Sequence, residues 1–447
     1  MNLEILNLYL YWRTRISMIR RLLLFLVPIF GFSQGYTSYF TGNPINVNPT
    51  TEYGVCLMGG ATENDNAMTW LLEKANGGDI VVLRSSGSNG YNDYLYSDLG
   101  VTVNSVETLV ITSVAGATNP YVLDKVSKAE MIWFAGGDQW NYVSYFKDNA
   151  LEDLLNYHVN VKHAPIGGTS AGMAILGGIY FSAENGTITS AQALNNPYHP
   201  NATLGGFIGT EPNNDFLNVP LLGNLITDTH YDNPDRRGRH VAFIARFFPI
   251  ISVKGIACNE YVAVCIGNDG IAKVYGDYPN YNEFAYFILP NCNIGNSVYC
   301  QPNQPLTWNF GGQAIKVYKV PGTMNGTNYF DLSDGWQNGG VGGSWEHWSV
   351  INGVFSSVAG TAQSCALSNS NFENESLKLF PNPVENIIYV EGLFNFNFEV
   401  YDSLGKKILD SYSTSNAIDV SSLTTGFYLL KIFSDGKTTI RKFIKNN

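Results

Sequence analysis

The chain has 447 residues, of which 45% are hydrophobic and 14% charged, a balance typical of folded proteins that excludes an intrinsically disordered chain. This length predicts roughly two to four domains. The formal net charge of −11 and the isoelectric point near 5.0 leave no basic stripe to neutralise phosphates, so we expect no nucleic-acid partner. No cysteine or histidine spacing resembles a zinc site, and we expect neither a metal nor a cofactor.

The N-terminus predicts an export signal within residues 1–34. Residues 18–21 carry two arginines, residues 22–32 are apolar, and residues 31–34 fit a cleavage zone. The apolar run is shorter than the ~20 residues that cross a bilayer, so we expect a cleaved signal peptide and no stable membrane span. Because Met18 directly precedes the basic residues, we expect translation to start at Met18 rather than at Met1.

Short apolar runs then alternate with helix-like segments up to residue 290. The apolar runs are residues 53–58, 79–83, 108–112 and 131–134, and the helix-like segments include residues 64–74 and 140–157. This alternation predicts an α/β domain over residues 35–290, with a parallel sheet covered by helices on both faces. Sites in such sheets lie beyond the carboxyl ends of the strands, where the turns at residues 59–60, 136–137 and 170 would converge.

Residues 168–172, Gly-Thr-Ser-Ala-Gly, follow a short apolar run and predict a nucleophile elbow that exposes the hydroxyl of Ser170. A serine nucleophile needs a base and a carboxylate that orients the base. His230 follows an apolar segment, and Glu260 lies between two strand-like runs, where a carboxylate is costly without a partner. Asp228 is the second-ranked orienting acid. The order Ser, His, acid differs from that of α/β-hydrolases.

Four segments in this order resemble the signatures of the cyanophycinase and aspartyl dipeptidase family of serine peptidases, peptidase family S51. They are residues 134–139, 167–172, 228–230 with 237–239, and 259–260, and the resemblance covers residues 50–290. The resemblance implies a fold like that of class I glutamine amidotransferases. It also implies a catalytic triad of Ser170, His230 and Glu260, and substrates that are aspartyl dipeptides or cyanophycin, a poly-aspartate with arginine on its side chains.

Backbone N–H groups of Gly137 and Ala171 are expected to hold the oxyanion. Gln139 is a candidate substrate contact, although Asp138 before it also fits a helix N-cap. Arg237 or Arg239 would grip a substrate carboxylate, and because residues two apart do not share a helix face, only one of them is expected to reach the site. Asp228 completes the expected substrate-binding set.

Two positions depart from the family pattern. Thr229 stands where cyanophycinases usually have Gln, and Ala242 stands where a third arginine is usual. We therefore expect short acidic peptides to be better substrates than cyanophycin. The alternative from another functional class is a catalytically idle surface protein that binds a peptide or a glycan.

Past residue 290 the sequence turns β-rich. Residues 291–367 predict a β-rich extension, whose residues Trp345, His347 and Trp348 are more often core aromatics than a sugar site. Within the extension, Cys292 and Cys300 flank a loop and are expected to pair, whereas Cys56, Cys258 and Cys265 are expected in the core.

A linker, residues 368–375, leads to residues 376–447, whose alternating pattern predicts a small antiparallel β-sandwich. Residues 377–383 and 426–445 resemble the C-terminal sorting domain of the type IX secretion system. This resemblance implies secretion or cell-surface display after export through the periplasm and across the outer membrane, with the type IX machinery as partner. Together the motifs predict a secreted serine peptidase acting on Asp-containing peptides.

Overall fold

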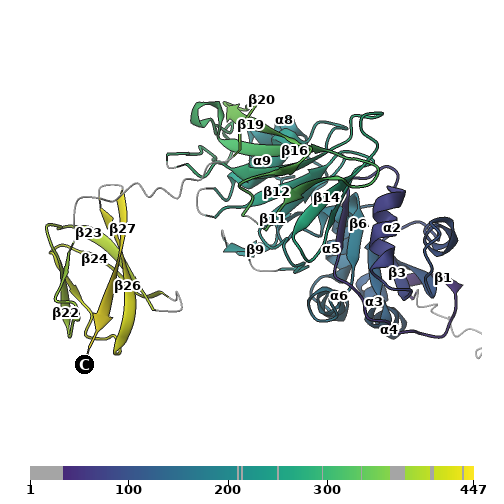
Figure 1. Cartoon of the computed structure of the whole chain (residues 1–447), viewed down its shortest axis with the longest axis horizontal. Coiled ribbons are helices and arrows are strands. Elements are labelled where there is room, and N and C mark those ends of the chain that lie inside the picture. Colours follow the sequence, from purple (N-terminus) through teal and green to yellow (C-terminus); the bar gives the residue numbers. More distant parts are fainter. Residues whose placement is uncertain are drawn as a thin grey trace, which may run out of the picture. The chain divides into compact units, whose positions relative to one another are not determined.

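The computed structural model describes residues 34–362, except 209–210, 213–214, 249–250, 294 and 334, and residues 378–446, except 403–406 and 435–436. Residues 1–33 of the expected leader and the whole expected linker, 368–375, lie outside the described residues. The chain divides into two compact units, with the boundary between Cys365 and Ala366 (Figure 1). None of the helices in the described residues is long and apolar enough to cross a membrane.

The first unit is built around a ten-stranded sheet. In spatial order its strands are β1 (Tyr36–Gly42), β4 (Ser105–Ile111), β3 (Asp79–Arg84), β5 (Met131–Phe134), β6 (Ile166–Thr169), β2 (Val55–Met58), β13 (Ala263–Ile266), β14 (Ile271–Tyr275), β17 (Asn328–Asp331) and β18 (Gly340–Val341). Strands β4, β3, β5, β6 and β2 are parallel, as expected. The outer strands are antiparallel, so the sheet is mixed.

Connection length explains the antiparallel half. A parallel neighbour requires a crossover of roughly a dozen residues or more. Residues 267–270 between β13 and β14 are too few for a crossover, and the two strands form a hairpin. The expectation of a parallel sheet is therefore right for the strands that alternate with helices and wrong for those that follow one another directly.

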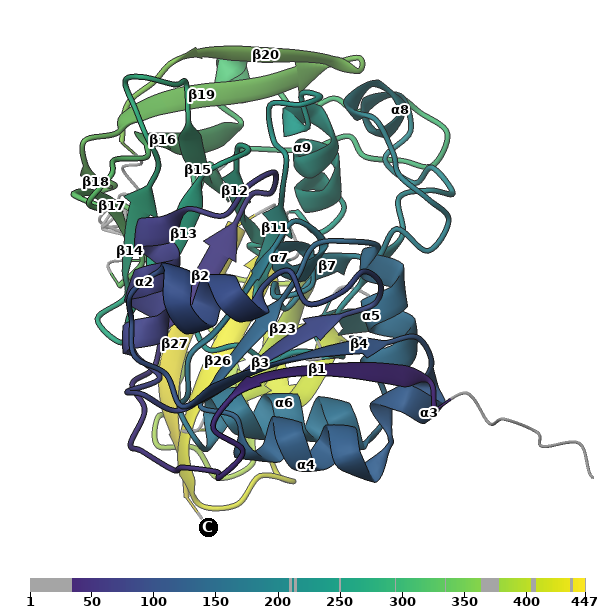
Figure 2. The ribbon, with the colours of Figure 1, turned by 90° about the vertical axis from the view of Figure 1, so that its right-hand side faces the viewer.

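Helices cover both faces of the parallel strands (Figure 2). They are α2 (Asp65–Glu73), α3 (Val114–Ala117), α4 (Pro120–Lys128), α5 (Gln139–Phe146) and α6 (Ala150–Asn160). Alternate residues of one strand enter opposite cores: Leu57 of β2 packs with α4, α5 and α6, while Met58 packs with α2. Burial on both faces accounts for the apolar runs in β2, β3 and β5.

A second, six-stranded sheet lies in the same unit. Its strands are β11 (Leu225–Asp228), β12 (Lys254–Cys258), β15 (Phe284–Pro290), β16 (Ile315–Pro321), β19 (Ser344–Ile351) and β20 (Val354–Ala359). Helix α9 (Arg237–Ala245) packs with this sheet and contacts α8 (Ser190–Asn195). The remaining short elements are β7 (Tyr180–Phe181), β8 (Leu204–Gly205), β9 (Phe207–Ile208), β10 (Glu211–Pro212), η1 (Tyr94–Asp98) and η2 (Phe310–Gly312).

The segment from residue 291 to residue 362 contributes strands to both sheets, β16, β19 and β20 to one and β17 and β18 to the other. It therefore shares its sheets with the residues before it. On β19, Trp348 is fully buried and donates from Nε1 to Oε2 of Glu346 at 2.7 Å, and Trp345 packs on Tyr318. These aromatic residues serve packing.

The expected pairing of Cys292 with Cys300 is wrong, because Cys292 is disulfide-bonded while Cys300 is a free thiol. Cys300 packs against the core of the six-stranded sheet, and burial raises its pKa to about 11. A short separation in sequence does not orient two Cβ atoms toward each other, which a disulfide requires. Cys56, Cys258 and Cys265 are buried free thiols, as expected.

The second unit has two antiparallel sheets that share one hydrophobic core. Its strands are β21 (Leu379–Phe380), β22 (Ile387–Val390), β23 (Phe396–Tyr401), β24 (Lys407–Ser413), β25 (Ala417–Asp419), β26 (Gly426–Ser434) and β27 (Lys437–Lys445). Alternating residues such as Tyr428, Leu430 and Ile432 point into this core, which is the period-two pattern expected from the sequence.

Candidate active site

Ser170 lies in a sharp turn between β6, in the middle of the ten-stranded sheet, and the short helix α7 (Ala171–Ala174). Its φ of 53° and ψ of −115° are strained for a residue with a side chain. The turn is possible because its flanking glycines are small. A Cβ on Gly168 would lie 2.6 Å from the backbone of Gly172, and a Cβ on Gly172 would overlap the carbonyl oxygen of Phe134.

His230 approaches Ser170 from the loop after β11. Its Nε2 lies 2.8 Å from Oγ of Ser170. The backbone of His230 has a φ of 45°, and its N–H donates to the carbonyl of Gly59 at 2.8 Å. Gly60, with a φ of +117°, lies against the imidazole ring, so a Cβ at that position would overlap it. The end of β2 therefore fixes the histidine.

Glu260 reaches the other side of the imidazole from the loop between β12 and β13. Its Oε1 lies 2.7 Å from Nδ1 of His230, and its Oε2 accepts from Asn233 at 3.4 Å. The hydrogen bond with His230 lowers the pKa of Glu260 below its usual value. About a fifth of each side chain is exposed, 23% for His230 and 22% for Glu260. The carboxylate is thus available to orient the imidazole.

Asp228, the alternative orienting acid, faces away from His230 toward Arg239. The two side chains form a buried ion pair, with Arg239 Nε donating to Asp228 Oδ2 at 2.9 Å. Burial raises the pKa of Asp228, but the charge and hydrogen bonds of Arg239 outweigh burial and leave the pKa below its usual value. The second-ranked acid is therefore engaged elsewhere.

Ser170, His230 and Glu260 form a continuous line of hydrogen bonds. In such a line the imidazole can take the serine proton while the carboxylate fixes its tautomer and stabilises the imidazolium. The N–H groups of Gly137 and Ala171, expected to hold an oxyanion, have no acceptor within the described residues. Ala171 begins α7, whose first N–H groups lack intrahelical partners.

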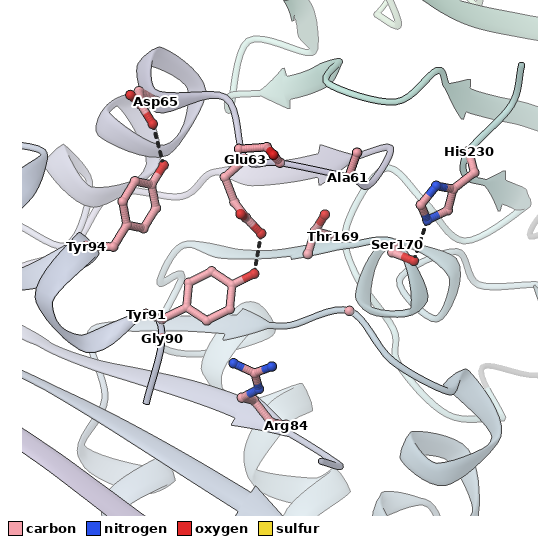
Figure 3. A pocket seen from close by; sticks show the side chains of 12 residues that line it. Ala61, Glu63, Asp65, Arg84, Gly90, Tyr91, Tyr94, Thr169, Ser170 and His230 are labelled. Carbon is pink, nitrogen blue, oxygen red and sulfur yellow. Dashed lines mark hydrogen bonds between the residues drawn. The ribbon is translucent and has the colours of Figure 1, made fainter. Parts of the chain in front are cut away.

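Two cavities meet at Ser170 and His230. The larger, of about 620 Å³, is shown in Figure 3. It is lined by Ala61, Thr62, Glu63, Asp65, Arg84, Gly90, Tyr91, Tyr94, Gly136, Thr169, Ser170 and His230. On one wall, Glu63 accepts a hydrogen bond from Tyr91, and Asp65 accepts one from Tyr94 at 2.8 Å. Arg84 lies on the far side of Tyr91 from Glu63 (Figure 3).

The smaller cavity, of about 190 Å³, is also lined by Ser170 and His230. It is lined by Gly137, Gln139, Ser170, Ala174, Phe181, Ala183, Thr187, Thr227, Asp228, Thr229, His230, Arg236 and Arg239. Asp138 caps α5, as expected, and Gln139 lines this cavity and donates to the carbonyl of Phe181 at 3.4 Å. Its charged lining residues, Asp228, Arg236 and Arg239, sum to one positive charge.

Arg237 lines neither of these cavities. Its guanidinium pairs with Asp235 at 2.6 Å and lies 5.2 Å from the ring of Phe355. Its neighbour Arg236 lines the smaller cavity instead and donates to the carbonyl of Thr229 at 3.0 Å. Burial lowers the pKa of Arg236 below its usual value. Sequence reasoning missed Arg236, and the only available signal was that it adjoins the expected pair.

The two departures from the family pattern differ in their position. Thr229 lines the smaller cavity, whereas Ala242 is fully buried within α9, in the core beside the six-stranded sheet. An alanine there does not remove a polar group from the cavity. The expectation that Ala242 weakens substrate binding is therefore wrong, because position 242 faces the core.

Comparison with known proteins gives matches to one protein family and to two cyanophycinases. Residues 378–446 match the secretion system C-terminal sorting domain family. The chain is also similar to the cyanophycinases of Synechococcus elongatus and Thermosynechococcus vestitus, at 25% identity over 233 residues. This alignment covers 50% of the chain and 65% of each relative. The matches agree with both resemblances seen in the sequence.

Two solved structures are also similar. One is a peptidase from an acI-B1 actinobacterium, with a TM-score of 0.37 and 14% identity, covering 53% of this chain and 94% of that one. The other is PorZ, a surface component of the type IX secretion system of Porphyromonas gingivalis, with a TM-score of 0.15 and 10% identity, covering 41% of this chain and 30% of that one. Likeness at these scores carries no argument about function.

The sorting domain itself indicates export across the outer membrane, to the cell surface or the medium.

Proposed function

We propose that the chain is a secreted serine peptidase of the cyanophycinase type. The observation that carries the proposal is the pair of contacts around one imidazole, 2.8 Å from Ser170 Oγ to His230 Nε2 and 2.7 Å from His230 Nδ1 to Glu260 Oε1. Similarity to two cyanophycinases supports a hydrolase of peptide bonds. The sorting domain supports action outside the cell or at its surface.

In the proposed reaction, Ser170 attacks the carbonyl carbon of the scissile peptide bond and His230 takes the serine proton. The N–H groups of Gly137 and Ala171 stabilise the negative oxygen of the tetrahedral intermediate. His230 then gives the proton to the leaving amine, which departs and leaves an acyl-serine. Water, deprotonated by the same histidine, hydrolyses this ester and regenerates Ser170. Glu260 stays ionised and stabilises the imidazolium in both steps.

Substrate preference follows from the smaller cavity. Asp228 already neutralises Arg239, whereas Arg236 is held by a neutral carbonyl and forms no ion pair in the described part of the chain. A partly buried cation without a counter-ion favours an anionic ligand. We therefore place the side chain of an acidic residue, on the acyl side of the scissile bond, in the smaller cavity beside Arg236.

Between the two substrate classes of the family, short aspartyl peptides remain the proposed choice. Of the two departures, only Thr229 faces the cavity, so one expected polar group is missing rather than two. A hydrogen bond to a charged group is worth about 1.5–3 kcal/mol. On that scale we expect cyanophycin to be the poorer substrate by about 10- to 100-fold in kcat/KM.

A fluorophosphonate probe tests the proposed nucleophile. The wild-type protein should be labelled at Ser170, and Ser170→Ala should abolish both labelling and hydrolysis of an aspartyl peptide, by about 10⁴-fold or more. Ser127→Ala, which removes an exposed hydroxyl of α4, is the matched control and should change neither. Hydrolysis by Ser170→Ala within tenfold of wild type would remove this serine from the mechanism.

A further inference from the structure

Arg84 lies at the carboxyl end of β3 and lines the larger cavity together with Ser170 and His230 (Figure 3). In the described residues Arg237 and Arg239 hold carboxylates, but Arg84 forms no ion pair. Its guanidinium is held by backbone carbonyl groups instead, so no carboxylate is in direct contact with it. No sequence motif singled out this residue.

The orientation of the guanidinium is fixed before any ligand arrives. Nε donates to the carbonyl of Ser86 at 3.0 Å, and Nη1 donates to the carbonyl of Ser88 at 3.1 Å. The guanidinium carbon lies 5.6 Å from the centre of the Tyr91 ring. Little side-chain entropy therefore remains to be lost when this group binds an anion.

The outer nitrogen, Nη2, is left for a ligand. It has no hydrogen-bond acceptor among the residues that the structure describes. Gly87 lies beside it with a φ of +91°, and a Cβ at that position would come within 2.6 Å of Nη2. The loop from Ser86 to Ser88 thus holds the guanidinium through two carbonyl groups, and its glycine places no side chain against Nη2.

The two carboxylates that line the same cavity form no ion pair with Arg84 in the described residues. Glu63 accepts from the hydroxyl of Tyr91, and Asp65 accepts from that of Tyr94. The ring of Tyr91 stands between Arg84 and Glu63 (Figure 3). A partly buried cation with a free outer edge is suited to a carboxylate, which the planar guanidinium fork binds with directed hydrogen bonds.

We propose that Arg84 binds a carboxylate of the leaving residue and determines specificity on that side of the scissile bond. The inference rests on the proposed function. With an acidic acyl residue in the smaller cavity, the residue beyond the scissile bond lies across Ser170, in the larger cavity that contains Arg84. The carboxylate belongs either to the chain end or to an acidic side chain of that residue.

Four peptides separate these two sources. Asp-Ala against Asp-Ala-amide tests a terminal carboxylate, and Asp-Glu-amide against Asp-Gln-amide tests a side-chain carboxylate. We expect kcat/KM of the wild type to favour the carboxylate form by about tenfold or more in at least one pair, through KM, as for a charged hydrogen bond. Arg84→Gln should remove that preference, and Arg84→Lys should retain part of it.

Arg237→Gln is the matched control, because Arg237 lines neither cavity, and it should keep the wild-type preference. Calorimetry then measures binding of the same four peptides to the inactive Ser170→Ala protein. This measurement tests the carboxylate site independently of hydrolysis. If the Ser170→Ala protein discriminates in binding but the wild type hydrolyses none of the four peptides, the proposed function is contradicted and the carboxylate site is retained.

Two results would overturn the carboxylate site. One is a wild type that treats both members of each pair alike, in binding and in hydrolysis. The other is an Arg84→Gln protein that loses kcat equally on all four peptides and keeps the wild-type preference. The second result would reduce Arg84 to a residue that only orders the loop of Ser86 and Ser88.

Discussion

Arg236 and Arg84 line the smaller and the larger cavity beside Ser170, and each is held by backbone carbonyl groups rather than by a carboxylate. Arg239 and Arg237 instead form ion pairs with Asp228 and Asp235. An arginine without such a pair can bind a charged ligand directly. Charge that is not neutralised within the protein is what selects a charged substrate. At the residue scale, the proposed specificity therefore depends on Arg236 and Arg84.

Arg236→Gln tests the smaller cavity. We expect kcat/KM for an Asp-Ala peptide to fall by about 10- to 100-fold, because a charged hydrogen bond is lost, while kcat/KM for the matching Asn-Ala peptide changes little. Steady-state kinetics on the two peptides give the ratio. Arg237→Gln serves as the control and should preserve it. An Arg236→Gln protein with the wild-type preference for Asp would move the acidic side chain elsewhere.

The two acids near His230 should respond differently to loss of charge. Glu260→Gln should lower kcat with little effect on stability, because the carboxylate acts on the imidazolium and is partly exposed. Asp228→Asn should instead destabilise the fold by about 3–5 kcal/mol, because it leaves Arg239 buried without a partner. Denaturant unfolding and kinetics on both variants separate the roles.

An exposed pair provides the control for that comparison. Asp235→Asn breaks the contact with Arg237 and should cost less than about 1 kcal/mol.

The contribution of Asp228 to stability also has a predictable pH dependence. Its folded pKa lies below the usual value, so its stabilisation is present at neutral pH and is lost as the pH falls through the folded pKa. A kcat loss confined to Asp228→Asn would reverse the two assignments.

At the scale of elements, the site is assembled from turns at the ends of strands. Ser170 follows β6, His230 follows β11, Glu260 lies between β12 and β13, and the turn after β2 touches all three loops. The carbonyls of Gly59 and Gly60 accept from the N–H groups of His230 and Tyr261, the latter at 3.0 Å. Backbone contacts thus position the imidazole and the carboxylate together.

Gly60→Ala should disrupt this assembly. The new Cβ overlaps the imidazole of His230 and would displace it. We expect kcat to fall by at least about 100-fold, because a misplacement of about 1 Å costs roughly that much in rate. Gly186→Ala is the matched control: Gly186 also has a positive φ, +85°, but a Cβ there meets nothing within 4 Å. It should cost about 1–2 kcal/mol of stability and no activity. Full activity in Gly60→Ala would show that the loop of His230 moves freely.

At the scale of the whole molecule, chemistry and export occupy separate parts of the chain. All residues of the proposed triad and of both cavities lie between Ala61 and Glu260, whereas the sorting domain covers residues 378–446. The second unit has its own hydrophobic core. The first unit therefore contains every group that the proposed reaction uses.

Deleting residues 376–447 should leave the purified protein active but retain it in the periplasm of its host. Fractionation of cells and medium, with kinetics on the truncated protein, measures both effects. The full-length Ser170→Ala protein is the control and should be exported normally without activity. Appearance of the truncated protein outside the cell would contradict the sorting role of residues 378–446.

The amino-acid sequence by itself determined the features that depend on local sterics and on chemistry in short segments. The elbow around Ser170 needs small residues on both sides. A Cβ at position 172 would overlap the carbonyl oxygen of Phe134, so only glycine fits there. The strand-helix alternation in the first half predicted the parallel part of the sheet. His230 and Glu260 were identifiable because polar residues that end apolar strands gather at one edge.

Tertiary structure alone decided which side chains face the cavities. The start of α9 carries three arginines, Arg236, Arg237 and Arg239. Successive residues of a helix point in directions about 100° apart. Sequence spacing therefore cannot tell which of the three reaches a site that other elements enclose. Ala242 faces the core, Cys300 stays unpaired, and Arg84 enters the site from β3, far from any motif. Each depends on packing between segments distant in sequence, which no local pattern encodes.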